Sequence, residues 1–254
     1  MLMIIIGMTG PIGHGKSTFA KAIGSINNST IRFESSLIIS EVANALHQAT
    51  GKLPDRYSVD SINDWLKPLP RIIEEIARQQ CSLEQIIIEQ SDAERHPIEY
   101  DKLMLHLESL QRNPEMLHQQ ITVENKEAYR PVLQWLGGYL VKNVSADIWY
   151  NEILRRVKVA ENEGYEICII GGLRFPRDAN NVRKSGGVII KVYRPDHLQY
   201  DMLDPTERER DNIPTDSTIV SNGTVEDMLN CAKQVIKDIQ ENNLQKLYQT
   251  KRFN

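Results

Sequence analysis

A glycine-rich stretch at residues 10–17 constrains the fold more than any other part of the chain. It reads Gly-Pro-Ile-Gly-His-Gly-Lys-Ser, the spacing of a phosphate-binding P-loop: a glycine, four residues, and then Gly-Lys-Ser. The apolar run from Met1 to Ile6 precedes it and predicts a buried parallel strand. Residues 17–23 predict the start of a helix. Because strand, loop and helix occur in this order, the pattern indicates a nucleotide site rather than an ordinary glycine-rich turn.

The chemistry of this stretch suits a triphosphate. Turned backbone N–H groups and a helix N-terminus attract anions, and glycines allow the positive φ angles and the close approach that such a loop needs. The Lys16 ammonium is expected to reach the β- and γ-phosphates, and the Ser17 hydroxyl to bind Mg²⁺. ATP and Mg²⁺ are therefore the predicted cofactors. The predicted nucleotide-binding residues are Gly10, Gly13, His14, Gly15, Lys16, Ser17 and Thr18.

Size and charge narrow the class of protein. A chain of 254 residues is long enough for one α/β domain with an inserted subdomain. Its net charge of −4 gives no general case for binding nucleic acid or an anionic membrane surface. The cysteines are three, and two of them, Cys168 and Cys231, lie in apolar patterns that predict buried free thiols. These thiols and the absence of a signal-peptide pattern before the P-loop predict a cytoplasmic protein.

Hydrophobic periodicity predicts a three-layer P-loop NTPase fold, a parallel sheet flanked by helices, over residues 1–254. Besides the first strand, we expect strands at 30–34, 165–170, 188–193 and 218–221. We expect helices at 36–49, from Pro131, from a cap at Ser145, at 178–185 and from a near-capping box at Thr224.

Residues 52–121 predict a mostly helical insertion on this core, broken by several prolines and assigned to the acceptor side. Within it, residues 85–89 fit a strand or a helix equally well. The histidines of this part of the chain have no spacing typical of metal ligands, so we expect structural or surface roles for them. They are His47, His96, His106 and His118.

A charged segment at 194–215 follows the third strong strand. It is either a lid that closes over the phosphates, with Arg194, Arg208 or Arg210 reaching in, or a solvated loop. The sequence leaves both interpretations open.

Four stretches, taken in order, resemble a known family. They are the P-loop; Tyr-Arg-Pro-Val-Leu-Gln-Trp-Leu-Gly at 129–137 with Asp-Ile-Trp at 147–149; Leu-Arg-Phe-Pro-Arg-Asp-Ala at 173–179; and the tail from Glu207 to Asp227. Together they resemble the phage-type deoxynucleoside monophosphate kinases, which are P-loop kinases. The resemblance is loose over residues 1–50, good over 122–240 and absent over 52–121.

This resemblance implies transfer of the ATP γ-phosphoryl group to a (deoxy)nucleoside monophosphate, giving the diphosphate. Carried over by position, Arg130 and Arg174 hold the acceptor or the transferring phosphate and join Lys16 as catalytic residues. Gln134, Trp149 and Glu34 are assigned to the substrate site. The alternatives are a helix-start salt bridge for Arg130, a structural ion pair for Arg174 and core packing for Trp149.

The chain departs from the family pattern at one position. Family members usually carry an aspartate where this chain has Gly172, so the acidic residue expected to support Mg²⁺ is missing. Either another carboxylate substitutes, for which Glu34 is a candidate, or metal handling is poor. The missing acid also motivates a rival function, a nucleotide-binding regulator that has lost catalysis. A kinase acting on another small phosphorylated acceptor also fits, and a homodimer is compatible with the sequence.

Overall fold

A computed structural model describes residues 3–80, 97–143, 145, 147–195, 197 and 209–250 of the chain. The chain divides into two compact units. The first consists of Met1–Glu34 and Ile153–Asn254 and holds the sheet; the second is Ser35–Glu152 and is helical. The second unit contains the insertion predicted at 52–121, and a role of that insertion at the acceptor stays a prediction.

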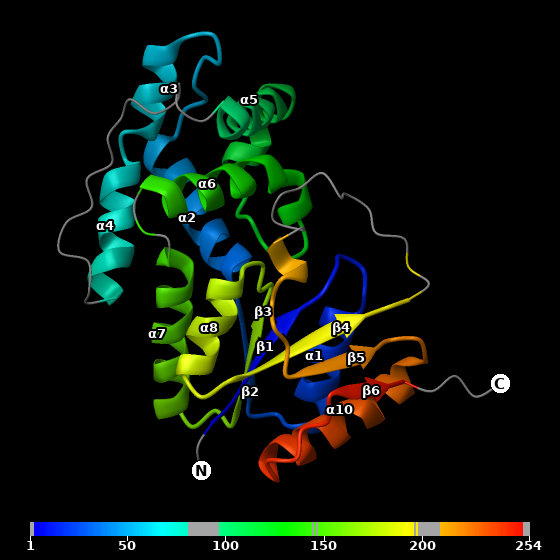
Figure 1. The fold of residues 1–254 in the computed structure, drawn as a ribbon. Helices are drawn as coiled ribbons and strands as arrows, with labels where there is room; N and C mark the ends of the chain where they lie inside the picture. The colour runs from blue at the N-terminus through cyan, green and yellow to red at the C-terminus, as the bar shows by residue number, and fades with distance from the viewer. Residues whose placement is uncertain are drawn as a thin grey trace. The chain divides into compact units, whose positions relative to one another are not determined.

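The sheet has six strands in the order β2-β3-β1-β4-β5-β6, and every neighbouring pair is parallel (Figure 1). The predicted parallel sheet flanked by helices is thus confirmed. Strand β1 lies inside the sheet, between β3 and β4. The loop that follows it starts at the carboxyl edge of the sheet, where open α/β sheets bind ligands. The strands are β1 (Ile4–Thr9), β2 (Thr30–Glu34), β3 (Ile167–Gly171), β4 (Val188–Tyr193), β5 (Ser217–Val220) and β6 (Leu247–Gln249).

The first strand differs from its prediction. It starts at Ile4 rather than Met1 and continues to Thr9, because pairing with β4 holds Thr9 opposite Lys191 after the apolar run has ended. Strand β6 was not predicted at all. It is only three residues long, and parallel pairing with β5 holds it at the edge of the sheet.

Helices cover both faces of the sheet. Helices α1 (Lys16–Ile26) and α10 (Val225–Gln240) pack on one face, where Phe19, Ile23 and Val235 enter the main core. Helix α8 (Pro176–Lys184) lies on the other face (Figure 1). The predicted capping box at the start of α10 is confirmed: Thr224 Oγ1 accepts from the Asp227 N–H, and the Asp227 carboxylate accepts from the Thr224 N–H. Cys168 and Cys231 are buried free thiols, as predicted; Cys81 lies outside the described residues.

The helical unit is built mainly around α2 and α6. The predicted helices at 36–49 and from Pro131 are confirmed, and residues 85–89 lie outside the described residues. Its elements are α2 (Ser35–Thr50), α3 (Val59–Leu66), α4 (Leu69–Gln80), α5 (Pro97–Arg112), the 3₁₀ turns η1 (Pro114–Leu117) and η2 (Lys126–Tyr129), and α6 (Arg130–Asn143). Helix α7 (Ile148–Asn162) contributes residues to both units.

Two of the histidines form a buried pair inside the helical unit. His47 on α2 and His106 on α5 lie between the rings of Trp65 and Tyr129. Their Nε2 atoms are 3.2 Å apart, whereas the centroids of the nearly parallel rings are 5.4 Å apart. These distances require the rings to lie end to end, so one Nε2–H donates to the other Nε2. Burial lowers the pKa of His47 to about 4 and that of His106 to about 3, so both rings are neutral at pH 7.

This pair makes the stability of the protein sensitive to acid. The unfolded chain takes up protons on both histidines below their ordinary pKa of 6.5, whereas the folded chain does not until pH 4 or lower. The contribution of the two histidines to the free energy of unfolding is therefore fully present above pH 6.5, and it is lost as the pH falls toward their folded-state pKa values. We expect the two groups to cost roughly 2–4 kcal/mol between pH 7 and pH 5, measured by urea unfolding at each pH.

The double variant His47→Leu/His106→Leu should flatten this dependence. His118→Gln, at an exposed histidine, is the control and should flatten the slope far less, because the charge of His118 is the smaller cause of the lowered His47 pKa and burial the larger. An unchanged slope in the double variant would show that the acid sensitivity arises elsewhere.

Candidate functional site

The loop between β1 and α1 has the backbone of an anion site. Gly10, Gly13 and Gly15 have φ angles of 131°, 80° and 99°, the left-handed values that the sequence predicted. Gly15 is the residue before α1, so the N–H groups of the first turn of that helix, which have no partners within the helix, face the loop. The arrangement offers several aligned donors to a phosphate at the carboxyl edge of the sheet.

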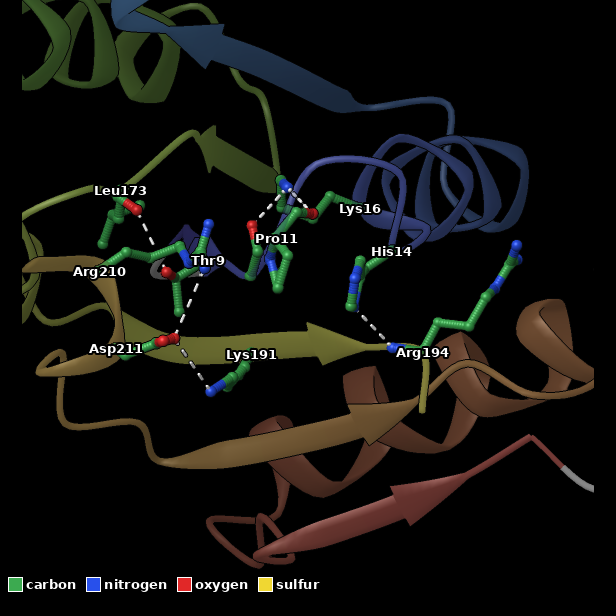
Figure 2. A network of polar contacts seen from close by, with 10 residues as sticks. Thr9, Pro11, His14, Lys16, Leu173, Lys191, Arg194, Arg210 and Asp211 are labelled. Carbon is green, nitrogen blue, oxygen red and sulfur yellow. Dashed lines mark hydrogen bonds and ion pairs between the residues drawn. The ribbon is translucent and has the colours of Figure 1, made fainter. Parts of the chain in front are cut away.

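The side chain of Lys16 turns back onto its own loop. Its ammonium donates to the carbonyl oxygens of Gly10 and Pro11 at 2.5 and 2.6 Å (Figure 2). Burial, followed by the positive charges of Arg210 and Arg174, lowers the pKa of Lys16 to about 8, and Glu34 acts in the opposite direction. A bound phosphate would supply the negative charge that favours the protonated form.

Arg174 is brought to this loop by the turn after β3. Leu173 is tied to the end of β1 twice: its N–H donates to the Met8 carbonyl at 3.1 Å, and its carbonyl accepts from the Thr9 hydroxyl at 3.1 Å. The buried carboxylate of Asp178 accepts from the N–H groups of Arg174 and Phe175 at 3.1 and 3.0 Å. The backbone that carries Arg174 is therefore fixed from both sides. Sequence reasoning named Arg174 but gave Asp178 no part in the site.

Arg210 adds a buried cation to the same place. Its guanidinium is paired with Asp211, which also pairs with Lys191 on β4 (Figure 2). Burial lowers the pKa of Arg210, and Arg174 adds to this lowering because the two positive charges are close. The sequence named Arg210 among three arginines of a lid or loop. Of the lid predicted at 194–215, residues 196 and 198–208, Arg208 among them, lie outside the described residues, and the choice between lid and loop stays open.

The His14 side chain ties the loop to the chain just after β4, and its predicted contact with the nucleotide stays a prediction. Its Nδ1 accepts from the backbone N–H of Arg194 at 3.0 Å, just after β4 (Figure 2). Burial, followed by the charge of His197, lowers the pKa of His14 to about 4, so the ring is neutral and carries its proton on Nε2. Arg194 in turn donates through Nε to the Ser221 carbonyl. The P-loop is thereby connected to the ends of β4 and β5.

Ser17 and Glu34 are joined through a residue that the sequence did not single out. Arg32, on β2, forms an ion pair with the Glu34 carboxylate, and the same Nη2 atom lies 3.4 Å from the Ser17 hydroxyl. Ser17 is exposed, and Thr18, beside it in the first turn of α1, is half-buried.

The remaining predicted site residues, Arg130, Gln134 and Trp149, belong to the helical unit. Arg130 is exposed at the start of α6 and pairs with Glu127 at 3.0 Å, and Gln134 is half-buried one turn later. Trp149 is buried, and its indole N–H donates to the Gly137 carbonyl at 3.2 Å. These contacts are those of the structural alternatives for Arg130 and Trp149, and the acceptor roles of all three residues stay predictions.

The described residues hold neither a metal-binding cluster nor a membrane-spanning helix. No three His, Cys, Asp or Glu side chains in the described ranges gather into a metal-binding group. Nor does the described part of the chain contain a helix that is both long and apolar enough to cross a membrane.

Comparison with known families then decides the class. The family model for deoxynucleotide monophosphate kinase matches residues 73–231, more than half of the 254 residues. The chain belongs to the deoxynucleotide monophosphate kinase family. Comparison with curated proteins found no significant match.

The matched range includes Arg130, Gln134, Trp149 and Arg174 but not the P-loop. The family match and the geometry of the loop at 10–17 are therefore independent observations, because they concern different parts of the chain. The family model indicates a nucleotide substrate, and the backbone of the loop has the geometry of an anion site.

We predict that Asp178→Ala weakens phosphate binding through Arg174. Loss of a carboxylate that accepts two backbone N–H groups should cost about 1–2 kcal/mol of stability, and the turn carrying Arg174 should loosen. The measurements are urea unfolding and the affinity for a non-hydrolysable ATP analogue.

The matched control is Asp227→Ala, which removes the similar cap of α10. It should lower stability comparably but leave analogue affinity unchanged. Equal analogue affinity in the Asp178 variant and the wild type would contradict the positioning role.

Proposed function

We propose that the protein transfers the γ-phosphoryl group of ATP to a deoxynucleoside monophosphate and releases the diphosphate and ADP. One observation carries the proposal: in a member of this kinase family, a P-loop backbone and three cationic side chains converge at the carboxyl edge of the sheet. These are Lys16 on the loop, Arg174 in the turn that is bonded to the end of β1, and Arg210. Besides burial, the charges of Arg210 and Arg174 lower the pKa of Lys16, and the charge of Arg174 lowers that of Arg210. Phosphoryl transfer depends mainly on positioning and on stabilising charge, and this arrangement supplies both.

The free loop must rearrange when ATP binds. Lys16 would exchange the carbonyls of Gly10 and Pro11 for the β- and γ-phosphate oxygens, which are better partners because they are charged. The N–H groups at the start of α1 would hold the β-phosphate. Arg174 and Arg210 would then neutralise the charge that spreads over the transferring group.

The acceptor residues come from the sequence. By position in the family, Arg130 would bind the monophosphate, with Gln134 and Trp149 near the nucleoside and Glu34 also assigned to this site. We retain the predicted cytoplasmic location as part of the proposal.

The residues present fit a magnesium ion. Ser17 offers a hydroxyl oxygen and Glu34 a carboxylate, the hard oxygen donors that Mg²⁺ prefers, and a cationic group already lies between them. When bound, the ion would neutralise charge on the β- and γ-phosphates.

We expect Lys16→Ala to lower kcat/KM by about 100- to 1,000-fold, since a charged donor to the transferring group is lost. The measurement is coupled detection of ADP with a panel of ribo- and deoxynucleoside monophosphates. Lys21→Ala, on the exposed side of the same helix, is the control and should retain full activity.

Absence of turnover on every acceptor, with ATP binding retained, would sink the kinase proposal. It would favour the nucleotide-binding regulator that the missing acid at Gly172 suggests. Turnover confined to a different phosphorylated acceptor would support the other alternative.

Binding of ATP should also take up protons near pH 8. Lys16, with a pKa of about 8, is half deprotonated there in the free protein. The triphosphate raises that pKa, so about half a proton should be bound per complex. Titration calorimetry in buffers of different ionisation enthalpy measures this uptake. Lys16→Arg, whose guanidinium stays protonated, should abolish it; the same uptake in that variant would assign the proton to another group.

A further inference from the structure

The end of β2 supplies a carboxylate beside the position where the family pattern has its aspartate. Glu34 is the last residue of β2 and lies opposite Gly171 in the parallel pairing of β2 with β3. A Cβ atom built on Gly171 would lie 2.8 Å from Glu34 Oε1, whereas one built on Gly172 would meet nothing within 4 Å. The Glu34 carboxylate therefore covers the end of β3 and uses the space that a side chain at Gly171 would need.

A guanidinium already bridges this carboxylate and the P-loop. Arg32 and Glu34 are two residues apart on β2, so their side chains emerge on the same face of the strand. The Nη2 atom of Arg32 pairs with Glu34 Oε1 and lies 3.4 Å from Ser17 Oγ. The side chain of Glu34 is only 14% exposed, so its negative charge is partly desolvated and needs a cationic partner.

Two oxygens with a positive nitrogen between them form the arrangement that a metal-bound nucleotide would require. Ser17 is the hydroxyl of the Gly-Lys-Ser motif, and Glu34 is the carboxylate that lies over the end of β3. A divalent cation would place two positive charges where the guanidinium places one. Both cannot occupy that position, because they would share the same two ligands and repel each other.

We propose that Arg32 occupies the divalent-cation position between Ser17 and Glu34, that metal-bound nucleotide displaces it, and that Glu34 provides the carboxylate missing at Gly172. This proposal rests on the proposed function for the identity of the nucleotide. It makes Arg32 a competitor of the metal, so the affinity for metal is set by the strength of the Arg32–Glu34 pair.

The test measures metal binding directly rather than activity. Manganese(II) is titrated into the full-length protein saturated with ADP, and free Mn²⁺ is followed by electron paramagnetic resonance. We expect Arg32→Gln to bind Mn²⁺ about tenfold more tightly than wild type, a difference of about 1.4 kcal/mol. We expect Glu34→Gln to bind it at least about tenfold more weakly.

Arg183→Gln is the matched control. Arg183 also pairs with a carboxylate, that of Asp216, and its side chain is 29% exposed against 32% for Arg32. Its Mn²⁺ affinity should equal that of wild type. Arg32→Met is a second variant of similar length, to be used if the glutamine variant does not fold.

Unchanged or weaker Mn²⁺ binding in both Arg32 variants overturns the proposal, as does unchanged binding in Glu34→Gln. A parallel titration of ADP in EDTA adds a further criterion. If loss of Arg32 weakens metal-free ADP binding while Mn²⁺ affinity stays constant, Arg32 replaces the metal permanently and displacement is wrong.

These outcomes are separate from those of the kinase assay. Wild-type turnover without any effect of Arg32 on Mn²⁺ overturns only the metal proposal. The expected Mn²⁺ shifts without turnover on any monophosphate overturn only the proposed function.

Discussion

Repulsion between like charges at the carboxyl edge of β1 and β3 is the constraint on which this structure depends. Burial makes protonation of Lys16 and Arg210 less favourable, and nearby positive charges add to this: those of Arg210 and Arg174 at Lys16, and that of Arg174 at Arg210. Such a cluster raises the free energy of the folded state until an anion arrives. Nearby carboxylates offset part of this cost: Glu34 favours protonation of Lys16, and Asp211 forms an ion pair with Arg210.

The backbone, more than the side chains, keeps these cations together. The turn that carries Arg174 is bonded to the end of β1 on one side and to Asp178 on the other. The P-loop is held from behind by His14, through Arg194 and the β5 end. The Asp178 cap is local, whereas the bonds of Leu173 to the end of β1 and of His14 to Arg194 join segments far apart in sequence. The base of the site is therefore held by contacts that only the folded chain makes.

The sequence predicted the parts of the fold that local patterns control. The strand limits at 30–34 and 188–193 and the cap at Thr224 match the structure, because apolar alternation and capping act over a few residues. The three-residue strand β6 carries too little pattern to be found, and the end of β1 is set by pairing with β4 rather than by its own residues.

The residues of the candidate site divide in the same way. The loop and Arg174 follow from motif and order, whereas the bracing role of His14 and the capping role of Asp178 depend on partners that only the folded chain brings near. Arg32 carried no signal, because a single arginine in a short strand has no motif. Its place in the candidate site depends on its contacts with Glu34, two residues later, and with Ser17 on α1.

The hydrogen bonds of Lys16 to its own loop have a consequence for selectivity. A loop whose lysine ammonium already donates two hydrogen bonds offers little net gain to a lone inorganic phosphate, since that ion must replace both bonds and provides few others. A polyphosphate chain spans the helix terminus and the arginines as well, so it recovers the loss. The hydrogen bonds of Lys16 to Gly10 and Pro11 thereby disfavour binding of small anions such as inorganic phosphate and favour polyphosphates.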